Sequence, residues 1–161
     1  MIFVTVGTHP QQFNRLLKKV DELVEKKIIK DKVFAQTGVS DYVPKNFEFK
    51  KMMPLKEFNE CMKKADLIIA QGGEGIIGTA LQLNKKLIIV PRYHKFGEHT
   101  NDHQLELTKA VEEEKRAIAV YNIEDLEKAL NNIKSFEARK FDKERKIISL
   151  IEGFAREKGL K

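Results

Sequence analysis

A glycine-rich turn beside a buried apolar run is the first place where the residue types predict chemistry. Residues 67–70 are Leu-Ile-Ile-Ala, a continuous apolar run typical of a strand buried on both faces of a parallel sheet. Gly72, Gly73 and Gly75 follow, and the apolar periodic segment 76–83 predicts a helix. Glycines permit positive φ and let backbone amides approach a ligand. Because free N–H groups and the positive end of a helix dipole then meet, the turn predicts a site for a phosphate-bearing small molecule.

A second polar loop is expected at the same edge of the sheet. Gly7, Thr8 and His9 follow the first apolar run, residues 2–6, and open α/β domains bind ligands at the carboxyl ends of their strands. Gly7 allows the turn, and Thr8 is a candidate cap for the first helix. His9 is a candidate ligand contact, and a polar loop residue near a helix start explains it equally well.

The loop after the fifth apolar run is rich in cations. It contains Arg92, His94 and Lys95 within residues 91–99, which follow the run 87–90. If the three side chains gather at the carboxyl edge of the sheet, they suit a diphosphate. The sequence therefore predicts a cationic cluster next to the glycine turn.

Histidines and carboxylates in the same region raise the question of a metal site. His99 and His103 are four residues apart, and His94, Glu98 and Asp102 lie close to them in the sequence. No cysteine joins the group, and its spacing matches no strong metal signature. We therefore expect no metal here, and we read His99 and His103 as polar contacts to a ligand or as part of an ordinary first helical turn.

Alternating strand-like and helix-like segments predict the fold. The first helix has its apolar residues on one face and lysines and acids on the other. Such alternation favours an α/β, Rossmann-like parallel sheet of about six strands. We expect one domain over residues 1–135, and a helical extension over 136–161 after a separating segment, 134–140. The strand-like runs are 2–6, 32–36, 47–50, 67–70, 87–90 and 117–120, and the apolar face of the first helix is Phe13, Leu16, Leu17, Val20, Leu23 and Val24.

Composition indicates a soluble globular protein. The 161 residues are 42% hydrophobic and 34% charged, which excludes a disordered chain. The one cysteine, Cys61, excludes an internal disulfide, and it is expected in the core with Leu55, Phe58 and Met62 of a helix over 55–64. The sequence shows neither a signal peptide nor a membrane span, so the expected location is the cytoplasm.

The end of the chain is basic and amphipathic. From Arg139 onward, eight Lys or Arg residues face four Asp or Glu residues, so much of the net charge of +6 lies there. This asymmetry favours contact with an acidic partner or an anionic membrane, and a solvated helix face explains it equally well. An apolar stripe predicts a helix that docks either on a partner or on this chain's own body; its residues are Phe141, Ile147, Ile148, Ile151, Phe154 and Ala155.

Four sequence blocks resemble one known family. They are MIFVTVGTHPQQFNRLL, QTGVSDYVPKNF, ADLIIAQGGEGIIGTALQLNKKLIIVP and FGEHTNDHQLELTK, in this order over roughly residues 1–135. Together they resemble the stand-alone C-terminal, donor-binding subunits of family-28-type glycosyltransferases. Such subunits pair with a separate membrane-associated subunit in lipid-linked oligosaccharide and exopolysaccharide synthesis.

The resemblance implies half of an enzyme. In that family two Rossmann-like domains face each other across a cleft, the GT-B arrangement. The C-terminal domain binds a UDP-sugar, and the other holds a polyprenyl-diphosphate-linked acceptor and supplies the general base. Transfer inverts the configuration at the anomeric carbon of the sugar and needs no metal or other cofactor. The resemblance thus implies no catalytic residue in this chain, a membrane-associated partner that recruits it to the inner face of the membrane, and no nucleic-acid partner. Whether the free subunit forms a homodimer stays open.

The resemblance also assigns roles to residues. Gly72, Gly73 and Gly75 would approach the donor's phosphates, Gln104 would hydrogen-bond the sugar, and Gly7 and Thr8 would face the cleft. The chain departs from the family where a histidine is replaced by Gln71, a serine or threonine by Ile76, and a ribose-binding glutamate by Thr79. Glu74 would compete with a phosphate for the same amides. The complete set of candidate donor-binding residues is Gly7, Thr8, His9, Gln71, Gly72, Gly73, Gly75, Thr79, Arg92, His99, His103 and Gln104.

Two other functions compete with this interpretation. Gly73, Gly75 and Gly78 have the spacing of a dinucleotide fingerprint, but the fingerprint normally follows the first strand, and no acidic ribose ligand ends the next one. A non-catalytic stabilising subunit with a degenerate donor site would explain the departures from the family pattern. Nucleic-acid binding is disfavoured because the basic charge lacks interleaved aromatic residues.

Overall fold

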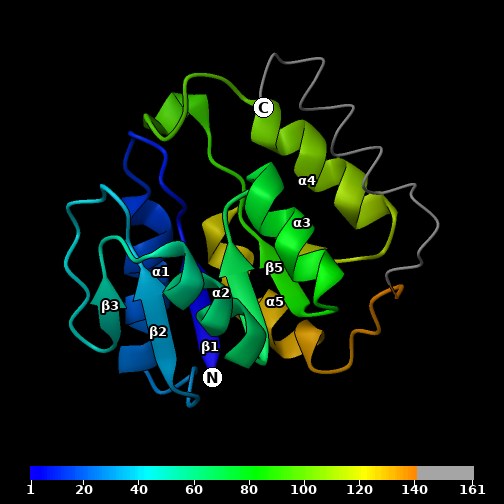
Figure 1. Cartoon of the computed structure of the whole chain (residues 1–161), viewed down its shortest axis with the longest axis horizontal. Coiled ribbons are helices and arrows are strands. Elements are labelled where there is room, and N and C mark those ends of the chain that lie inside the picture. Colours follow the sequence, from blue (N-terminus) through cyan, green and yellow to red (C-terminus); the bar gives the residue numbers. More distant parts are fainter. Residues whose placement is uncertain (141–161) are drawn as a thin grey trace.

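Six parallel strands form a single sheet in the computed structural model, which describes residues 1–140 (Figure 1). Their order across the sheet is β3-β2-β1-β4-β5-β6, the doubly wound order of a Rossmann-like domain. Each strand falls within or beside a run that the sequence predicts. The strands are β1 (Ile2–Thr5), β2 (Val33–Gln36), β3 (Glu48–Lys50), β4 (Leu67–Ala70), β5 (Lys86–Ile89) and β6 (Ile118–Ala119).

Within residues 1–140, five α-helices cover the two faces of this sheet (Figure 1). Helices α1 and α5 pack on one face, and α2, α3 and α4 pack on the other, as the two separate apolar cores show. Two short 3₁₀ turns, η1 (His94–Phe96) and η2 (Ile123–Asp125), lie between helices. The helices are α1 (Asn14–Glu25), α2 (Leu55–Lys64), α3 (Glu74–Gln82), α4 (His103–Glu113) and α5 (Leu126–Ile133).

The central strands supply both cores because successive side chains point to opposite faces. In β4, Ile68 packs in the core under α2, α3 and α4, whereas Ile69 packs in the core under α1 and α5. Phe3 and Val4 of β1 divide in the same way, and Val4 lies opposite Ile69 in the register. Burial on both faces explains why these strands are continuous apolar runs in the sequence.

The strand order reverses between β1 and β4, which pair side by side with Thr5 opposite Ala70. The loops that follow these two strands therefore leave the sheet at the same edge and diverge to opposite faces. Such a switch point is where open α/β sheets bind ligands. Both glycine-containing loops singled out in the sequence, after residues 6 and 70, begin here.

Two local expectations are wrong. Thr8 is exposed and does not cap α1. The N-cap is Phe13, whose N–H donates to Ser40 Oγ at 2.9 Å, and the N–H of Asn14 at the first helical position donates to Gln12 Oε1. Leu55 is 74% exposed, because it opens the first turn of α2 at the edge of the sheet. Met62 of the same helix is fully buried, and burial raises the pKa of the half-buried Cys61 thiol.

Residues 136–140 pack back onto the body of the domain. Phe136 contacts the core between the sheet and α5, and Arg139 N donates to Lys115 O at 2.9 Å. The predicted helix from Phe141 onward, with its apolar stripe, lies outside the described residues. None of the helices within 1–140 combines the length and the hydropathy needed to cross a lipid bilayer.

Candidate functional site

A cavity of about 770 Å³ opens at the carboxyl edge of the sheet, beside the switch point. Its walls come from the loop after β1, from α2, from the start of α3 and from the loop before α4. The structure thus brings together residues that are far apart in the sequence. Of the predicted site residues, all but Gly72, Arg92 and His103 line it: Gly7, Thr8, His9, Gln71, Gly73, Gly75, Thr79, His99 and Gln104.

The N-terminus of α3 forms part of the cavity wall. Gly73 is the N-cap in an extended conformation, and no side chain caps the helix. The first helical hydrogen bond in this turn runs from Ile77 N to Gly73 O, and Gly73, Glu74, Gly75 and Ile76 all line the cavity. The backbone N–H groups of a first helical turn have no partner within the helix. The turn therefore offers uncapped amides and the positive end of the helix dipole to an anion.

Gly72 of this turn is needed for close approach rather than for positive φ. Within residues 1–140 the glycines with positive φ are Gly7, Gly38 and Gly97, so residues 72, 73 and 75 do not use the positive φ that glycine permits. A Cβ on Gly72 would lie 2.8 Å from Thr108 Oγ1 and 3.0 Å from Gln104 O, so a side chain there would push α4 away. A Cβ on Gly75 would meet open space.

Arg92 is a fully buried anchor of the site, and the predicted cationic cluster does not form. Its guanidinium donates to four main-chain carbonyls in the surrounding loops and, through Nε, to Gln71 Oε1. Burial lowers the pKa of Arg92 to about 10. His94 and Lys95 are exposed on η1, where the Lys95 ammonium lies over the rings of Tyr93 and Phe96. The carbonyls that hold Arg92 belong to Val6, Gln11, Gln12 and Glu98.

Two glutamines connect this anchor to the cavity. Gln104 Oε1 accepts from the backbone N–H groups of Gly72 and Arg92, both at 3.0 Å, and Gln104 Nε2 donates to Gln71 Oε1 at 3.3 Å. Gln104 therefore ties α4 to the loops after β4 and β5, which leaves one N–H of its amide for a ligand. A Cβ on Gly7 would lie 1.9 Å from Gln71 Nε2, so the Gln71 amide packs directly on this glycine.

His9 and His99 stack in the cavity wall with their ring centroids 4.3 Å apart. In each ring Nδ1 accepts a backbone N–H two residues further on, from Gln11 at 3.2 Å and from Asn101 at 3.3 Å. Burial lowers the pKa of both, assisted by the neighbouring positive charges. Both imidazoles are thus mainly neutral at pH 7 with the proton on Nε2, which has no partner among the described residues and can donate to a ligand.

Sequence reasoning missed the ion pair that fixes the loop before α4. Arg15 of α1 donates to both carboxylate oxygens of the buried Glu98, at 2.8 and 3.0 Å, and Tyr93 N donates to the same carboxylate. The partners are 83 residues apart, so no local pattern connects them. The sequence predicted the apolar face of α2 but not its place in the cavity, where Leu55 and Phe58 form an apolar wall with Met53 of the preceding loop.

A comparison with protein-family models decides the family. The model described as the glycosyltransferase family 28 C-terminal domain matches residues 1–157. The chain belongs to this family. A comparison with curated protein sequences finds no significant relative.

Solved structures share the fold at low sequence identity. ALG13, solved by NMR, is 19% identical with a TM-score of 0.62, and the match covers 95% of this chain and 94% of ALG13. MurG of Acinetobacter baumannii is 15% identical with a TM-score of 0.59, over 96% of this chain and 49% of MurG. The spinosyn rhamnosyltransferase SpnG, complexed with thymidine diphosphate, is 14% identical with a TM-score of 0.56, over 97% of this chain and 40% of SpnG. This family 28 domain therefore spans half or less of the larger transferases and nearly all of ALG13.

The histidines and carboxylates of the loop before α4 are dispersed. Glu98 is bound to Arg15, Asp102 Oδ1 accepts from His94 N at 2.9 Å, and His103 lies outside the cavity in the first turn of α4. Within residues 1–140 no three His, Cys, Asp or Glu side chains are grouped as metal ligands. In this family 28 domain His99 belongs with His9 rather than with His103.

Proposed function

We propose that this chain is the donor-binding subunit of a two-component inverting glycosyltransferase. In this proposal the cavity at the switch point, which we call the donor cavity, holds a UDP-sugar without a metal. A membrane-associated partner subunit holds a polyprenyl-diphosphate-linked acceptor and supplies the general base. The chain is then cytoplasmic and reaches the inner face of the membrane through its partner.

The observation that carries the proposal is the uncapped N-terminus of α3, which opens into the cavity. A diphosphate placed there accepts hydrogen bonds from first-turn amides and meets the positive end of the helix dipole. The Nε2–H groups of His9 and His99 offer two further donors from the same wall. The apolar side chains of Met53 and Phe58 offer the surface on which a base and ribose can lie.

The cavity lining supports a division of labour between two chains. Its titratable side chains are His9, Glu74 and His99, and both imidazoles are committed at Nδ1 to backbone N–H groups. A histidine whose Nδ1 is an acceptor and whose Nε2 carries the proton is a hydrogen-bond donor to a ligand rather than a base. In this proposal the acceptor's hydroxyl group is therefore activated by the partner subunit.

Nearly complete coverage of ALG13, against 49% coverage of MurG, agrees with a subunit that corresponds to one half of a longer transferase. SpnG, which shares the fold, is described in complex with thymidine diphosphate, so a nucleoside diphosphate is the ligand class that we transfer to this cavity.

One observation favours a second candidate, a stabilising subunit that does not bind a donor. The Glu74 carboxylate sits in the first turn of α3, where it competes with a phosphate for the same amides. The side-chain oxygen of Gln104 is also fully engaged within the protein. Both features weaken a donor site without removing the fold.

A reconstitution assay tests the proposal. Membranes from source cells that lack this chain are mixed with labelled UDP-sugars, with and without the purified chain, and lipid-soluble label is measured. We expect transfer only when chain and membranes are combined. Robust transfer by the chain alone to a polyprenyl-linked acceptor, or absence of transfer from every mixture, would contradict the two-component proposal. Restored transfer by a chain that does not itself bind a UDP-sugar would favour the stabilising subunit.

A further inference from the structure

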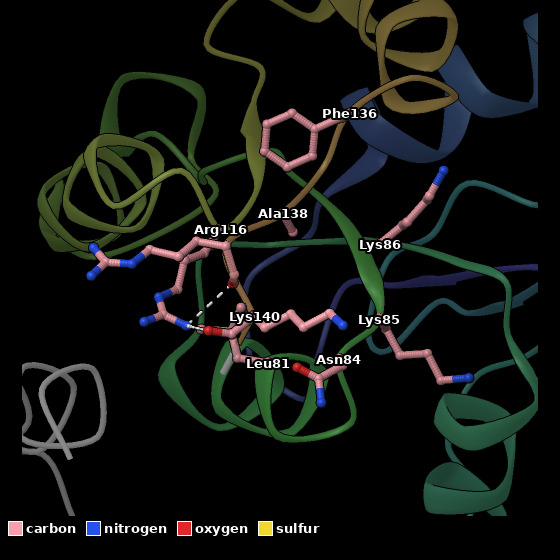
Figure 2. A pocket seen from close by; sticks show the side chains of 9 residues that line it. Leu81, Asn84, Lys85, Lys86, Arg116, Phe136, Ala138 and Lys140 are labelled. Carbon is pink, nitrogen blue, oxygen red and sulfur yellow. Dashed lines mark hydrogen bonds between the residues drawn. The ribbon is translucent and has the colours of Figure 1, made fainter. Parts of the chain in front are cut away.

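A second cavity, of about 440 Å³, lies at the opposite edge of the sheet (Figure 2). Lys85 and Lys86 precede or begin β5 and Arg116 precedes β6, so they mark the amino ends of these strands. Residues 136–140 close the cavity from the other side. Its lining is Leu81, Asn84, Lys85, Lys86, Arg116, Phe136, Ala138, Arg139 and Lys140.

The charge of this lining is one-sided. Five of its residues are Lys or Arg, and none is Asp or Glu. Among residues 1–140 the carboxylate paired with this group is Glu114, which contacts Arg139 at 3.2 Å between two exposed side chains. This pair offsets the charge of Arg139, and within residues 1–140 the other four cations of the lining form no ion pair. Among the described residues, the cavity therefore carries an excess of positive charge.

Arg116 is the central cation of this cavity. Its side chain is 5% exposed, and Nη1 donates to the main-chain oxygens of Arg139 at 3.3 Å and Lys140 at 3.0 Å (Figure 2). Its Nε is buried and has no hydrogen-bond partner within the described residues. A buried charge compensated by carbonyl dipoles alone retains a strong attraction for a counter-ion.

The two lysines beside β5 are held in place by helix ends. Lys85 Nζ donates to the oxygens of Lys63 and Ala65 at the end of α2, and Lys86 Nζ donates to those of Ile133 and Lys134 at the end of α5. Their stems line the cavity while their ammonium groups point away from it (Figure 2). They add positive potential without filling the space.

The Lys140 side chain crosses the cavity between Arg116 and the β5 lysines (Figure 2). Within residues 1–140 its ammonium group has no hydrogen bond or ion pair, whereas its main-chain oxygen is bound by Arg116. The ammonium group of Lys140 can thus bind a ligand directly, next to the buried guanidinium of Arg116, which is already held in place.

We propose that this cavity binds a phosphate group, either of an anionic lipid headgroup or of a free polyphosphate anion. Phosphate is a multiply charged acceptor, and Arg and Lys are the side chains that bind it best. The site is separate from the donor cavity because the two lie at opposite edges of the sheet. If the phosphate belongs to a lipid headgroup, its binding here would turn the carboxyl edge of the sheet away from the bilayer.

An NMR titration with inorganic pyrophosphate tests the site on the intact chain. We expect saturable shifts of the backbone amides of residues 85, 86, 116 and 139. The amides of residues 73–76 report the donor cavity separately, so failure at one site is distinguishable from failure at the other. Shifts confined to residues 73–76, or linear shifts without saturation, would overturn the proposal.

Substitution of Lys140 tests its charge without disturbing the main-chain oxygen that holds Arg116. We expect Lys140→Ala to weaken pyrophosphate binding at this site by roughly fivefold and Lys140→Glu to weaken it further. Lys128→Glu, at an exposed position on α5, changes the net charge equally and serves as the matched control. Equal weakening by Lys128→Glu and Lys140→Glu would reduce the effect to net charge and overturn a specific site.

Vesicle sedimentation then separates the two sources of phosphate. Binding to phosphatidylcholine vesicles with about 30% phosphatidylglycerol, lost in Lys140→Glu and kept in Lys128→Glu, assigns the site to a lipid headgroup. Equal vesicle binding by both variants, with saturable pyrophosphate shifts, assigns it to a free anion. If vesicle binding does not differ between the variants and the pyrophosphate shifts do not saturate, the site is rejected.

Discussion

His9 and His99 stack at 4.3 Å and join the loop after β1 to the loop after β5 in the wall of the donor cavity. Each ring uses Nδ1 to accept the N–H of a residue in its own loop, so both rings are fixed in one tautomer. Protonation of either ring would remove that acceptor and place positive charge against the neighbouring ring and Arg92. The packing of the pair therefore favours the neutral form of both rings.

This arrangement predicts a pH-dependent stability. Burial lowers the native pKa of both histidines below 6.5, so the unfolded chain takes up protons first as the pH falls. The free energy of unfolding should thus decline below about pH 6.5 until the native pKa values are passed. Urea unfolding at several pH values measures this slope. It should flatten in His9→Gln/His99→Gln and persist in the control His94→Gln; an unchanged slope in the double variant would contradict the interpretation.

Two glycines of α3 separate helix stability from ligand contact. A Cβ meets open space at both Gly75 and Gly78, but Gly75 alone of the two lines the donor cavity. Gly75→Ala and Gly78→Ala should each raise the free energy of unfolding by about 0.5–1 kcal/mol, because alanine is the better helix former. Calorimetry with UDP should show weaker binding for Gly75→Ala and unchanged binding for Gly78→Ala. Equal affinities in both variants would place the nucleotide away from this turn.

Glu74 should oppose donor binding. Its carboxylate lies in the first turn of α3 at the cavity wall, where a diphosphate would be placed. Glu74→Gln removes the charge at nearly constant size and should tighten UDP binding by about 0.3–1 kcal/mol, the usual strength of a charge at a helix terminus. Glu60→Gln, on the exposed side of α2, is the matched control. A loss of affinity in Glu74→Gln would show that the carboxylate itself binds the ligand.

Arg92 should act on stability, whereas Lys95 should act on neither stability nor binding. Arg92→Lys removes the fork that reaches four loop carbonyls and Gln71, and we expect it to lower the free energy of unfolding by roughly 3 kcal/mol. Lys95→Ala removes an exposed cation over two rings and should change it by less than about 1 kcal/mol. If Lys95→Ala weakens UDP binding strongly, the cationic cluster expected from the sequence exists after all.

The fold was predictable because its signals are local. A strand buried on both faces must be a continuous apolar run, so Leu67 to Ala70 identifies β4 without any knowledge of the partners. Topology then follows from chirality and from alternation of strands with helices. The resemblance to family 28 rests on the same segments and is confirmed by the family model.

The role of Arg92 was not predictable, because it depends on long-range contacts. From its place after a strand and a proline, Arg92 is expected to be an exposed loop cation. Its guanidinium instead donates to the carbonyl of Val6, which is 86 residues away in the sequence. The reason for the glycine at position 72 was also not predictable from the sequence. Close approach and positive φ both require glycine, and only the packing of α4 reveals that close approach is the reason.

The central claim is that the cavity at the switch point holds a uridine diphosphate donor. Titration of UDP into the purified chain tests it most directly. Binding is measured by calorimetry and by the NMR shifts of the backbone amides of residues 73–76, and NAD is the control. We expect saturable binding of one UDP with shifts in those amides and in the loops of His9 and His99, and no saturable binding of NAD. No binding of UDP, or equal binding of NAD at the same amides, would contradict it.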